Sequence, residues 1–161
     1  MTNREMAAII AGGWADAEAV PRYHNQIEVT CGNPDTIVGM LHYMQSLGFE
    51  HMSNLTCVDW PEENRFDVTY NLWSYKYQVQ ATVKAGIDRG EPKLPTVMDV
   101  WPQAQAYEQE IHEMFGVDFI GNPDLSSLFL HNWKDIPPLR KDFDTEAYSR
   151  IAYGAQRNKE V

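Results

Sequence analysis

Three apolar–polar alternations joined by short turns constrain this chain more than any other feature. They cover residues 49–60, 64–73 and 76–83, with two or three residues between one run and the next. A period of two places successive side chains on opposite faces of a strand, so each run is expected to bury one face. Connections this short join antiparallel neighbours. The sequence therefore predicts an antiparallel meander. The apolar positions of its middle run are Phe66, Val68, Tyr70 and Leu72.

Two amphipathic segments are expected to form helices against that sheet. The first follows Asn33, a residue type that caps helix N-termini, and carries an apolar stripe through residues 37–47 before Gly48. The second covers residues 104–115 and ends at Gly116. Glycine commonly follows the last helical residue because it adopts the left-handed conformation without a steric penalty.

The rest of the N-terminal sequence predicts shorter elements. Residues 3–11 suit a short helix, and residues 14–20 and 26–31 suit extended segments around a polar turn. The polar residues 85–95 are expected to connect the meander to a helical stretch around residues 97–101. The predicted fold class is α+β: a mixed, largely antiparallel sheet with helices packed on it and an extended C-terminal arm.

The character of the sequence changes after the predicted second helix. Residues 119–144 hold one glycine and three prolines among scattered large apolar side chains, without the periodicity of a core element. Proline fixes extended backbone and removes hydrogen-bond donors, so this chain is expected to lie along another surface. We therefore divide the sequence into an α/β domain, residues 1–116, and an extended partner-binding arm, residues 117–161.

Charge and hydropathy exclude several classes of protein. The chain has 161 residues, enough for one domain with a core, and its 23 acidic and 13 basic side chains give a net charge of −10. Binding a nucleic-acid backbone needs clustered lysine and arginine, so no nucleic-acid partner is expected. No stretch approaches the roughly 18 apolar residues that cross a bilayer, and the start does not resemble a signal peptide. No direct membrane insertion is expected, so other proteins would hold the chain at a membrane.

Cysteine usage argues against a redox centre in this chain. Cys31 and Cys57 lie in predicted strands, and buried positions in a reduced protein are their expected role. Without a CxxC pair, the chain cannot supply the four thiolates usual for an iron–sulfur cluster or a structural zinc. Phosphate-binding glycine loops and nucleophile elbows are absent as well. We therefore expect no metal and no cofactor in this chain.

The helix predicted at residues 104–115 carries the densest polar cluster. Its three glutamates, Glu108, Glu110 and Glu113, are expected to point away from its apolar side. Glu108 and His112 are four residues apart and could share a metal, but the HExxH pattern fails because a glycine stands where the second histidine is required. We interpret the pair as exposed or interfacial. A freestanding acid–base enzyme built on these side chains is the alternative from another functional class, and a free adaptor protein is a third.

Residues 137–143 predict a partner-binding segment. Two prolines fix extended backbone, and alternating apolar and charged side chains follow. Leu139 and Phe143 are expected to fill pockets of a partner, while the guanidinium of Arg140 meets a partner carboxylate. The competing interpretation is a solvated tail with incidental charges.

Three motifs follow one another in the C-terminal half: YEQEIHEMFGV at residues 107–117, GNPDL at residues 121–125 and PLRKDF at residues 138–143. Their order and spacing resemble the 30-kDa subunit family of respiratory complex I. The resemblance implies a subunit of a hydrophilic arm, peripheral on the cytoplasmic face of the cell membrane and without a redox centre. It would pack on the large catalytic subunit and near the small iron–sulfur subunit. Iron–sulfur clusters and, in a hydrogenase, a [NiFe] centre would belong to those partners.

The resemblance also marks candidate interface residues. They are Tyr107, Glu108, Glu110, Glu113, Phe115, Gly116, Pro123, Leu139, Arg140, Lys141, Asp142 and Phe143.

Three departures from the family pattern bear on the parent complex. Gln109 replaces an arginine that the family usually has, which removes a planar fork for a partner carboxylate. Asn122 replaces a histidine, and serines at residues 126–127 stand where the quinone-reducing branch commonly carries arginine. The wording of residues 111–116 is similar to the branch in energy-converting membrane-bound [NiFe] hydrogenases and related archaeal dehydrogenases. Both a hydrogen-evolving and a quinone-reducing parent, with ion translocation coupled to electron transfer, stay open.

Overall fold

The structure, a computed structural model, describes residues 1–154 and confirms the α+β class. The main strands are β1 Ala17–Pro21, β2 Gln26–Cys31, β3 His51–Trp60, β4 Arg65–Ser74 and β5 Val79–Asp88. They form one sheet in the order β1-β2-β5-β4-β3, in which only β2 and β5 are parallel neighbours. The helices are α1 Asn3–Gly13, α2 Ile37–Ser46, α3 Ala104–Phe115 and α4 Thr145–Tyr153, with short 3-10 turns at η1 Pro34–Thr36 and η2 Pro61–Glu63.

The predicted meander is confirmed as β3, β4 and β5. The four apolar positions of its middle strand are fully buried. β5 begins three residues later than predicted, because residues 75–78 form a turn. It ends five residues later, because Ala85 and Ile87 continue its alternation and lie opposite Val68 and Phe66. The assignment of residues 85–95 to a connection is therefore wrong at both ends: β5 runs to Asp88, and β6 (Lys93–Pro95) follows.

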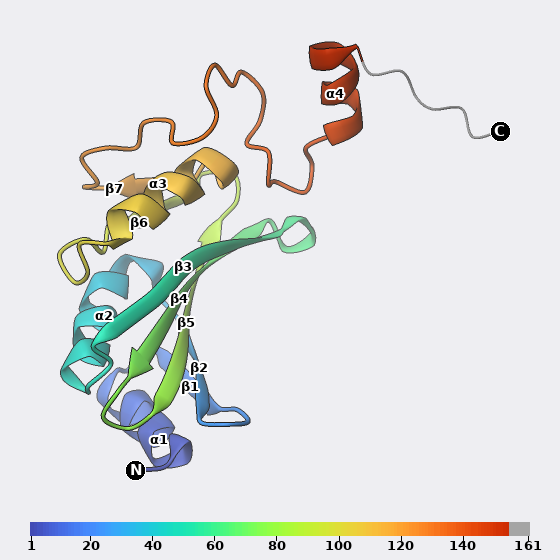
Figure 1. The fold of residues 1–161 in the computed structure, drawn as a ribbon. Coiled ribbons are helices and arrows are strands. Elements are labelled where there is room, and N and C mark those ends of the chain that lie inside the picture. Colours follow the sequence, from blue (N-terminus) through green and yellow to red (C-terminus); the bar gives the residue numbers. More distant parts are fainter. Residues whose placement is uncertain (155–161) are drawn as a thin grey trace.

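Helices α1, α2 and α3 contribute buried side chains to the core, whereas α4 has none. Figure 1 shows α1 and α2 beside the strands, and their buried side chains share one cluster with the sheet. A capping box between Thr2 and Glu5 starts α1, while Asn33 caps η1, which leads directly into α2. The predicted stop signals are confirmed: Gly48 and Gly116 both have positive φ. Each fully buried aliphatic or aromatic side chain contributes about 1.5–3 kcal/mol, so this cluster dominates the stability of the domain.

The helix predicted around residues 97–101 is wrong. These residues make a single turn in which the N–H groups of Val100 and Trp101 both donate to the carbonyl of Val97 at 3.0 Å. A longer helix cannot form because Pro102 follows and has no N–H. Val97 and Trp101 are buried, so the segment still belongs to the core.

The C-terminal arm is less uniform than predicted. Its first residues form β7 (Asp118–Ile120), which pairs in parallel with β6 and buries Phe119. Its described part ends in α4, a helix that the sequence pattern did not indicate. Between them, residues 121–144 contain no helix or strand. Figure 1 shows this stretch, hereafter the arm loop, passing α3 on its way to α4.

Candidate partner interface

One glutamate of helix α3 points into the protein. Glu108 is 0% exposed and accepts three hydrogen bonds: from the hydroxyl of Thr96 at 2.7 Å, the N–H of Val97 at 2.8 Å and the side-chain amide of Asn122 at 2.8 Å. Burial raises the pKa of this carboxyl, and the hydrogen bonds only partly oppose the rise. Glu108 thereby joins the turn after β6 and the start of the arm loop to α3.

The interpretation of Glu108 as an exposed or interfacial residue is therefore wrong. Residue 108 lies four positions after Ala104 and three before Ile111, both buried, so it stands within the apolar stripe of the helix. A side chain without exposed surface cannot contact a partner in this conformation. The helical spacing of residue 108 already indicated a buried position, but its charge favoured the interpretation as an exposed residue.

Two further polar side chains of α3 hold the arm loop. The amide of Gln109 donates to the carbonyl of Ser126 at 2.8 Å. The carboxylate of Glu113 accepts the N–H groups of Phe129 at 2.9 Å and Leu130 at 2.7 Å. Hydrogen bonds to a charged acceptor contribute about 1.5–3 kcal/mol. An irregular loop is thus fixed by its backbone, which leaves its side chains free to point elsewhere.

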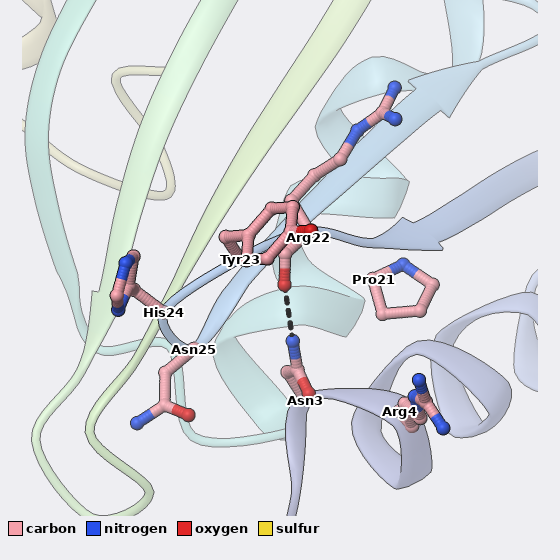
Figure 2. A pocket seen from close by; sticks show the side chains of 7 residues that line it. All are labelled: Asn3, Arg4, Pro21, Arg22, Tyr23, His24 and Asn25. Carbon is pink, nitrogen blue, oxygen red and sulfur yellow. Dashed lines mark hydrogen bonds between the residues drawn. The ribbon is translucent and has the colours of Figure 1, made fainter.

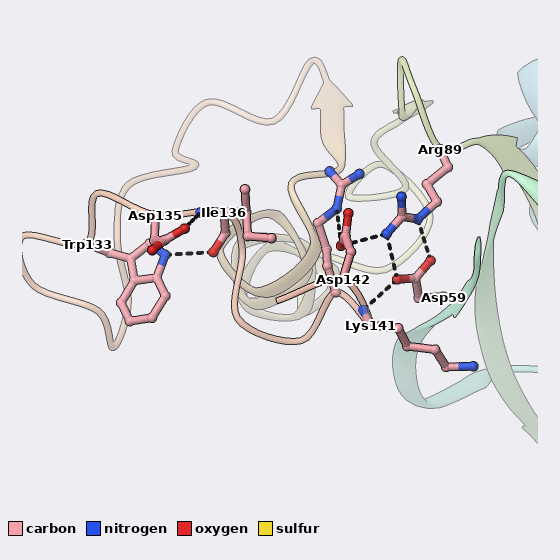
Figure 3. Close-up of polar contacts among 8 residues, drawn as sticks. Asp59, Arg89, Trp133, Asp135, Ile136, Lys141 and Asp142 are labelled. Atoms are coloured by element: carbon pink, nitrogen blue, oxygen red, sulfur yellow. Dashed lines mark hydrogen bonds and ion pairs between the residues drawn. The ribbon is translucent and has the colours of Figure 1, made fainter. Parts of the chain in front are cut away.

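A second set of contacts fastens the far end of the arm loop to the sheet (Figure 3). Asp59, the side chain of which is 1% exposed, receives Nε of Arg89 at 2.7 Å and Nη2 at 3.2 Å. The N–H of Lys141 donates to the same carboxylate at 2.8 Å. Arg89 also pairs with Asp142 at 2.7 Å. We call these four residues the latch.

The latch keeps a charged group inside the protein. Burial alone would raise the pKa of Asp59, but hydrogen bonds from Arg89 and from the Lys141 N–H, with the charges of Arg89 and Arg140, hold it below its ordinary value. The hydrogen bond to Asp59 in turn raises the pKa of Arg89. This end of the arm loop is therefore attached to a desolvated ion pair of the domain, through the N–H of Lys141 and the carboxylate of Asp142.

The predicted segment of residues 137–143 folds against its own domain. The guanidinium of Arg140 lies 5.4 Å from the ring centroid of Phe66, and its Nε is 3.6 Å from a carboxylate oxygen of Asp142. The side chain of Arg140 is 20% exposed. Leu139 is 54% exposed and borders a groove of about 210 Å³ between β3 and α3. Arg140 thus faces inwards, and Leu139 faces outwards.

The other candidate residues divide in the same way. Tyr107, Phe115 and Gly116 are half-buried within the chain, whereas Glu110 and Pro123 are exposed. Phe143 packs against Trp133 and Tyr148 in an aromatic cluster that attaches α4. The ammonium group of Lys141 lies 5.2 Å from the ring centroid of Trp60. The carboxylate of Asp142 pairs with Arg89 in the latch.

The C-terminal part of the chain presents most of the exposed large apolar side chains. Among residues 1–154 there are thirteen such side chains, and seven of them fall between residues 120 and 153, although this segment is much shorter than the domain before it. Concentrated exposed apolar groups mark sites of contact with other proteins. They are Ile120, Leu128, Phe129, Ile136, Leu139, Ile151 and Tyr153.

A separate hollow lies at the tip of the β1–β2 hairpin (Figure 2). It has a volume of about 590 Å³ and a rim of exposed polar groups that includes Arg4, Arg22 and His24. The side-chain amide of Asn3 donates to the carbonyl of Arg22 at 2.7 Å and braces the hairpin. No carboxylate lines this hollow, so it does not assemble a carboxylate-based acid–base site.

Residues 1–154 do not assemble a metal site. In that range no cluster of three or more histidine, cysteine or acidic side chains could hold a metal ion. Cys31 and Cys57 are free thiols and are buried, as predicted. No helix of the described chain has the length and apolar character to span a membrane.

Sequence reasoning missed the latch. Asp59 follows Leu55 and Cys57 at the inward-facing positions of β3, and an acid at such a position needs a buried cation. That alternation was a usable signal for Asp59. Nothing local identified Arg89 as its partner, because the two residues meet only through the pairing of β3, β4 and β5.

Comparison with sequence families identifies the chain's relatives. A model described as "Respiratory-chain NADH dehydrogenase, 30 Kd subunit" matches residues 29–149. An NADH-quinone oxidoreductase subunit of Ruegeria sp. (strain TM1040) is 32% identical over 142 residues, which is 86% of this chain and 70% of the relative. The mitochondrial NADH-ubiquinone oxidoreductase 30.4 kDa subunit of Neurospora crassa is 33% identical over 126 residues, 78% of this chain and 44% of the relative. The chain thus spans only part of these proteins.

Solved structures give a closer match in shape. A chain of the membrane-bound sulfane sulfur reductase (MBS), an archaeal respiratory membrane complex, superposes with a TM-score of 0.88 at 30% identity. The match covers 98% of this chain and 95% of that one. The trypsin-resistant fragment of Nqo5 superposes with a TM-score of 0.64 at 23% identity, over 77% of this chain and all of the fragment. The second likeness concerns the fold alone.

Proposed function

Because the chain belongs to the 30-kDa subunit family of respiratory-chain NADH dehydrogenase, it is a subunit of a complex I-like respiratory complex, and we propose that it is the cofactor-free docking subunit. In this proposal it lies in the hydrophilic part of the complex, on the cytoplasmic face of the membrane. Its arm packs on the large catalytic subunit, close to the small iron–sulfur subunit. Those partners carry the clusters and the reacting centre, and the whole complex couples electron transfer to ion translocation.

One observation carries this proposal: polar contacts fix the arm loop, and several of its apolar side chains face outwards. Leu128, Phe129 and Leu139 are 38%, 59% and 54% exposed. Carboxylates of Glu113 and Asp59 hold the backbone behind them. A preformed loop loses less conformational entropy on binding than a flexible one, so more of the contact energy appears as affinity.

Arg140 keeps a role at this interface as part of the proposal. Its guanidinium is held near Phe66 and Asp142, and none of its side-chain N–H groups makes a hydrogen bond with the described residues. A carboxylate or carbonyl of the large subunit would satisfy the exposed part of the group. The apolar anchors beside it would exclude water and strengthen that contact.

We consider two kinds of parent complex. The likeness to a chain of an archaeal respiratory membrane complex supports a parent of that general type, among which we include the energy-converting [NiFe] hydrogenases indicated by residues 111–116. Relatives named as subunits of NADH-quinone oxidoreductase support a quinone-reducing NADH dehydrogenase as the second candidate. The freestanding acid–base enzyme has less support, because Glu108 is enclosed and Glu113 binds backbone N–H groups.

Gentle detergent extraction followed by affinity purification of the full chain tests the proposal. We expect a hydrogenase-like or 49-kDa-like large subunit and an iron–sulfur subunit in the eluate, in equal amounts. Hydrogen evolution and NADH-dependent quinone reduction by the purified complex distinguish the two parents. A chain that is recovered alone and is active on its own would refute docking.

A further inference from the structure

A cavity of about 260 Å³ lies between the C-terminal end of α3 and the arm loop. Leu125, Leu130, Trp133 and Pro137 give it apolar walls, and all four are half-buried. The indole N–H of Trp133 donates to the carbonyl of Ile136 at 2.9 Å, which holds the ring in place. The volume suits one large side chain more than a cofactor.

The polar groups at this cavity are hydrogen-bond acceptors. Glu113 lines it and accepts the N–H groups of Phe129 and Leu130. The N–H of Phe129 reaches both carboxylate oxygens, at 2.9 and 3.2 Å, so three of the roughly four acceptor positions of the carboxylate are used and about one stays open. Within residues 1–154 no lysine, arginine or histidine forms an ion pair with Glu113. Its negative charge is therefore uncompensated inside the described chain.

His112 and Ser127 extend this acceptor character. Nδ1 of His112 lies 2.8 Å from the carbonyl oxygen of Val117, and because a carbonyl only accepts, Nδ1 carries the proton. In the neutral imidazole, Nε2 then has the free lone pair. The hydroxyl of Ser127 makes no hydrogen bond to another described residue and is available in either role.

We propose that this cavity receives the guanidinium of an arginine from the large subunit, an inference that rests on the proposed docking of the arm. A cavity with open acceptors and an uncompensated carboxylate selects a group that only donates. The planar fork of arginine matches a carboxylate, and its face stacks on an aromatic ring such as Trp133. Lysine has neither property. Between residues 104 and 153, acidic side chains outnumber basic ones about two to one, which also favours a cationic partner.

The free full-length chain allows a first test with two small probes. N-acetyl-arginine amide carries the guanidinium, whereas N-acetyl-citrulline amide has nearly the same shape without the charge. In ¹⁵N-labelled protein we expect the arginine probe to shift the indole resonance of Trp133 in a saturable manner, and the citrulline probe to leave it in place. Equal shifts with both probes, or no arginine-specific shift up to about 50 mM, which corresponds to a very weak site, would overturn the proposal.

Three variants define the source of the effect. Glu113→Gln removes the charge but keeps an oxygen for the loop N–H groups, and Ser127→Leu fills the cavity from an exposed position. Both should weaken binding of the arginine probe at least about tenfold, the usual cost of losing a charge-assisted contact. Glu18→Gln makes the same charge change at an exposed position of β1, outside the candidate interface, and should bind as the wild type does. An unchanged amide resonance of Leu139, which donates to the carbonyl of Met114 and does not contact Glu113, verifies that the loop is still attached.

Co-purification of the same variants with the parent complex separates this inference from the docking proposal. We expect Glu113→Gln and Ser127→Leu to lower the yield of assembled complex, and Glu18→Gln to leave it unchanged. If Phe129→Ser prevents assembly but Glu113→Gln does not, docking through the arm stands and the guanidinium inference is wrong. If Phe129→Ser also assembles normally, the docking proposal itself fails.

Discussion

The sheet domain and the arm loop are ordered by different interactions. In the domain, side chains from α1, α2 and five strands form one apolar cluster, and the polar backbone is paired within regular elements. The arm loop has no such pairing along residues 121–144. Its backbone N–H groups bind carboxylates that the domain supplies, namely Glu113 and Asp59. One region is stabilised by burial, and the other is fixed by charge-assisted hydrogen bonds.

This difference determines which region can bind a partner. Most large apolar side chains of the domain are used in its core, although a few, such as Tyr23 and Tyr75, are exposed. In the arm loop the ordering contacts run through the backbone, which leaves side chains such as Phe129 and Leu139 exposed. A loop held in this way can be ordered and still expose apolar side chains to a partner. We regard this combination as the physical basis of the proposed docking role.

The two buried carboxylates repeat the contrast on a smaller scale. Glu108 belongs to the domain and is surrounded by neutral donors, so burial raises its pKa. Asp59 belongs to the latch and faces Arg89, so its pKa is lowered despite burial. A neutral environment favours the protonated acid, and a cationic one favours the carboxylate.

Breaking the latch should have the largest effect. Asp59→Ala leaves Arg89, 13% exposed, with Asp142 alone and removes the acceptor of the Lys141 N–H. Removing one partner of a buried pair costs about 3–5 kcal/mol, and we expect about 3 kcal/mol because Asp142 stays in place. Urea denaturation measures the free energy of unfolding, and limited proteolysis at Lys134 reports release of the arm loop.

The control for this prediction is Glu63→Ala. Glu63 pairs with Arg65 at 2.9 Å, but the two side chains are 53% and 42% exposed. Exposed pairs contribute less than about 1 kcal/mol. If Asp59→Ala costs no more than Glu63→Ala, the latch does not stabilise the fold and the contrast between the two regions is overstated.

A substitution of an exposed apolar residue in the arm loop should weaken assembly of the complex without changing the stability of the chain itself. Phe129→Ser removes a side chain that is 59% exposed, so the free energy of unfolding should change by less than about 0.5 kcal/mol. Loss of an aromatic anchor at an interface typically costs about 2 kcal/mol of binding, or more than tenfold in affinity. Titration of the purified chain onto a complex prepared without it gives this affinity. Tyr75→Ser, at a 64% exposed aromatic in the turn before β5, is the matched control and should bind normally.

The pH dependence of stability should have opposite signs for the two carboxylates. Asp59 has a lowered pKa in the folded state, so its stabilising effect is present above its unfolded pKa and is lost as the pH falls through the folded value. Glu108 has a raised pKa, so its contribution is most favourable below its unfolded pKa and declines as the pH rises through the folded value. Each slope is at most about 1.4 kcal/mol per pH unit.

Two conservative variants measure these slopes. The difference in unfolding free energy between the wild type and Asp59→Asn should shrink as the pH is lowered below about 4, the ordinary range of an aspartate. The difference between the wild type and Glu108→Gln should shrink as the pH is raised above about 4.5, beyond the ordinary range of a glutamate. Two slopes of the same sign would show that the environments of the carboxylates are not distinct.

The sequence predicted the domain better than the arm for a physical reason. Periodicity records which side chains face a core, and Phe66 to Leu72 or the stripe of α2 carry that signal clearly. The arm loop is fixed by backbone contacts to Glu113 and Asp59, which leave no period in residues 121–144. Its involvement in an interface was inferred from prolines and from family resemblance. Which of its side chains face outwards required the structure, as Arg140 and Leu139 demonstrate.

The smallest predicted effect, that of Tyr70→Phe, tests whether apolar burial alone stabilises the domain core. Tyr70 is fully buried in β4, and no other residue of the described chain forms a hydrogen bond with its hydroxyl. Burial raises the pKa of this phenol well above its ordinary value, so the group stays neutral. An unpaired buried hydroxyl costs about 1–3 kcal/mol, and Tyr70→Phe keeps the ring while removing it. Against a small loss of packing, we expect a gain of about 1 kcal/mol in the free energy of unfolding. Tyr107→Phe, which loses a hydrogen bond to the carbonyl of Ser53 at 3.3 Å, should instead destabilise the protein by about 0.5–1.5 kcal/mol, the usual net worth of such a bond. If Tyr70→Phe also destabilises, its hydroxyl has a partner such as an internal water, and polar contacts stabilise the domain core as well as the arm.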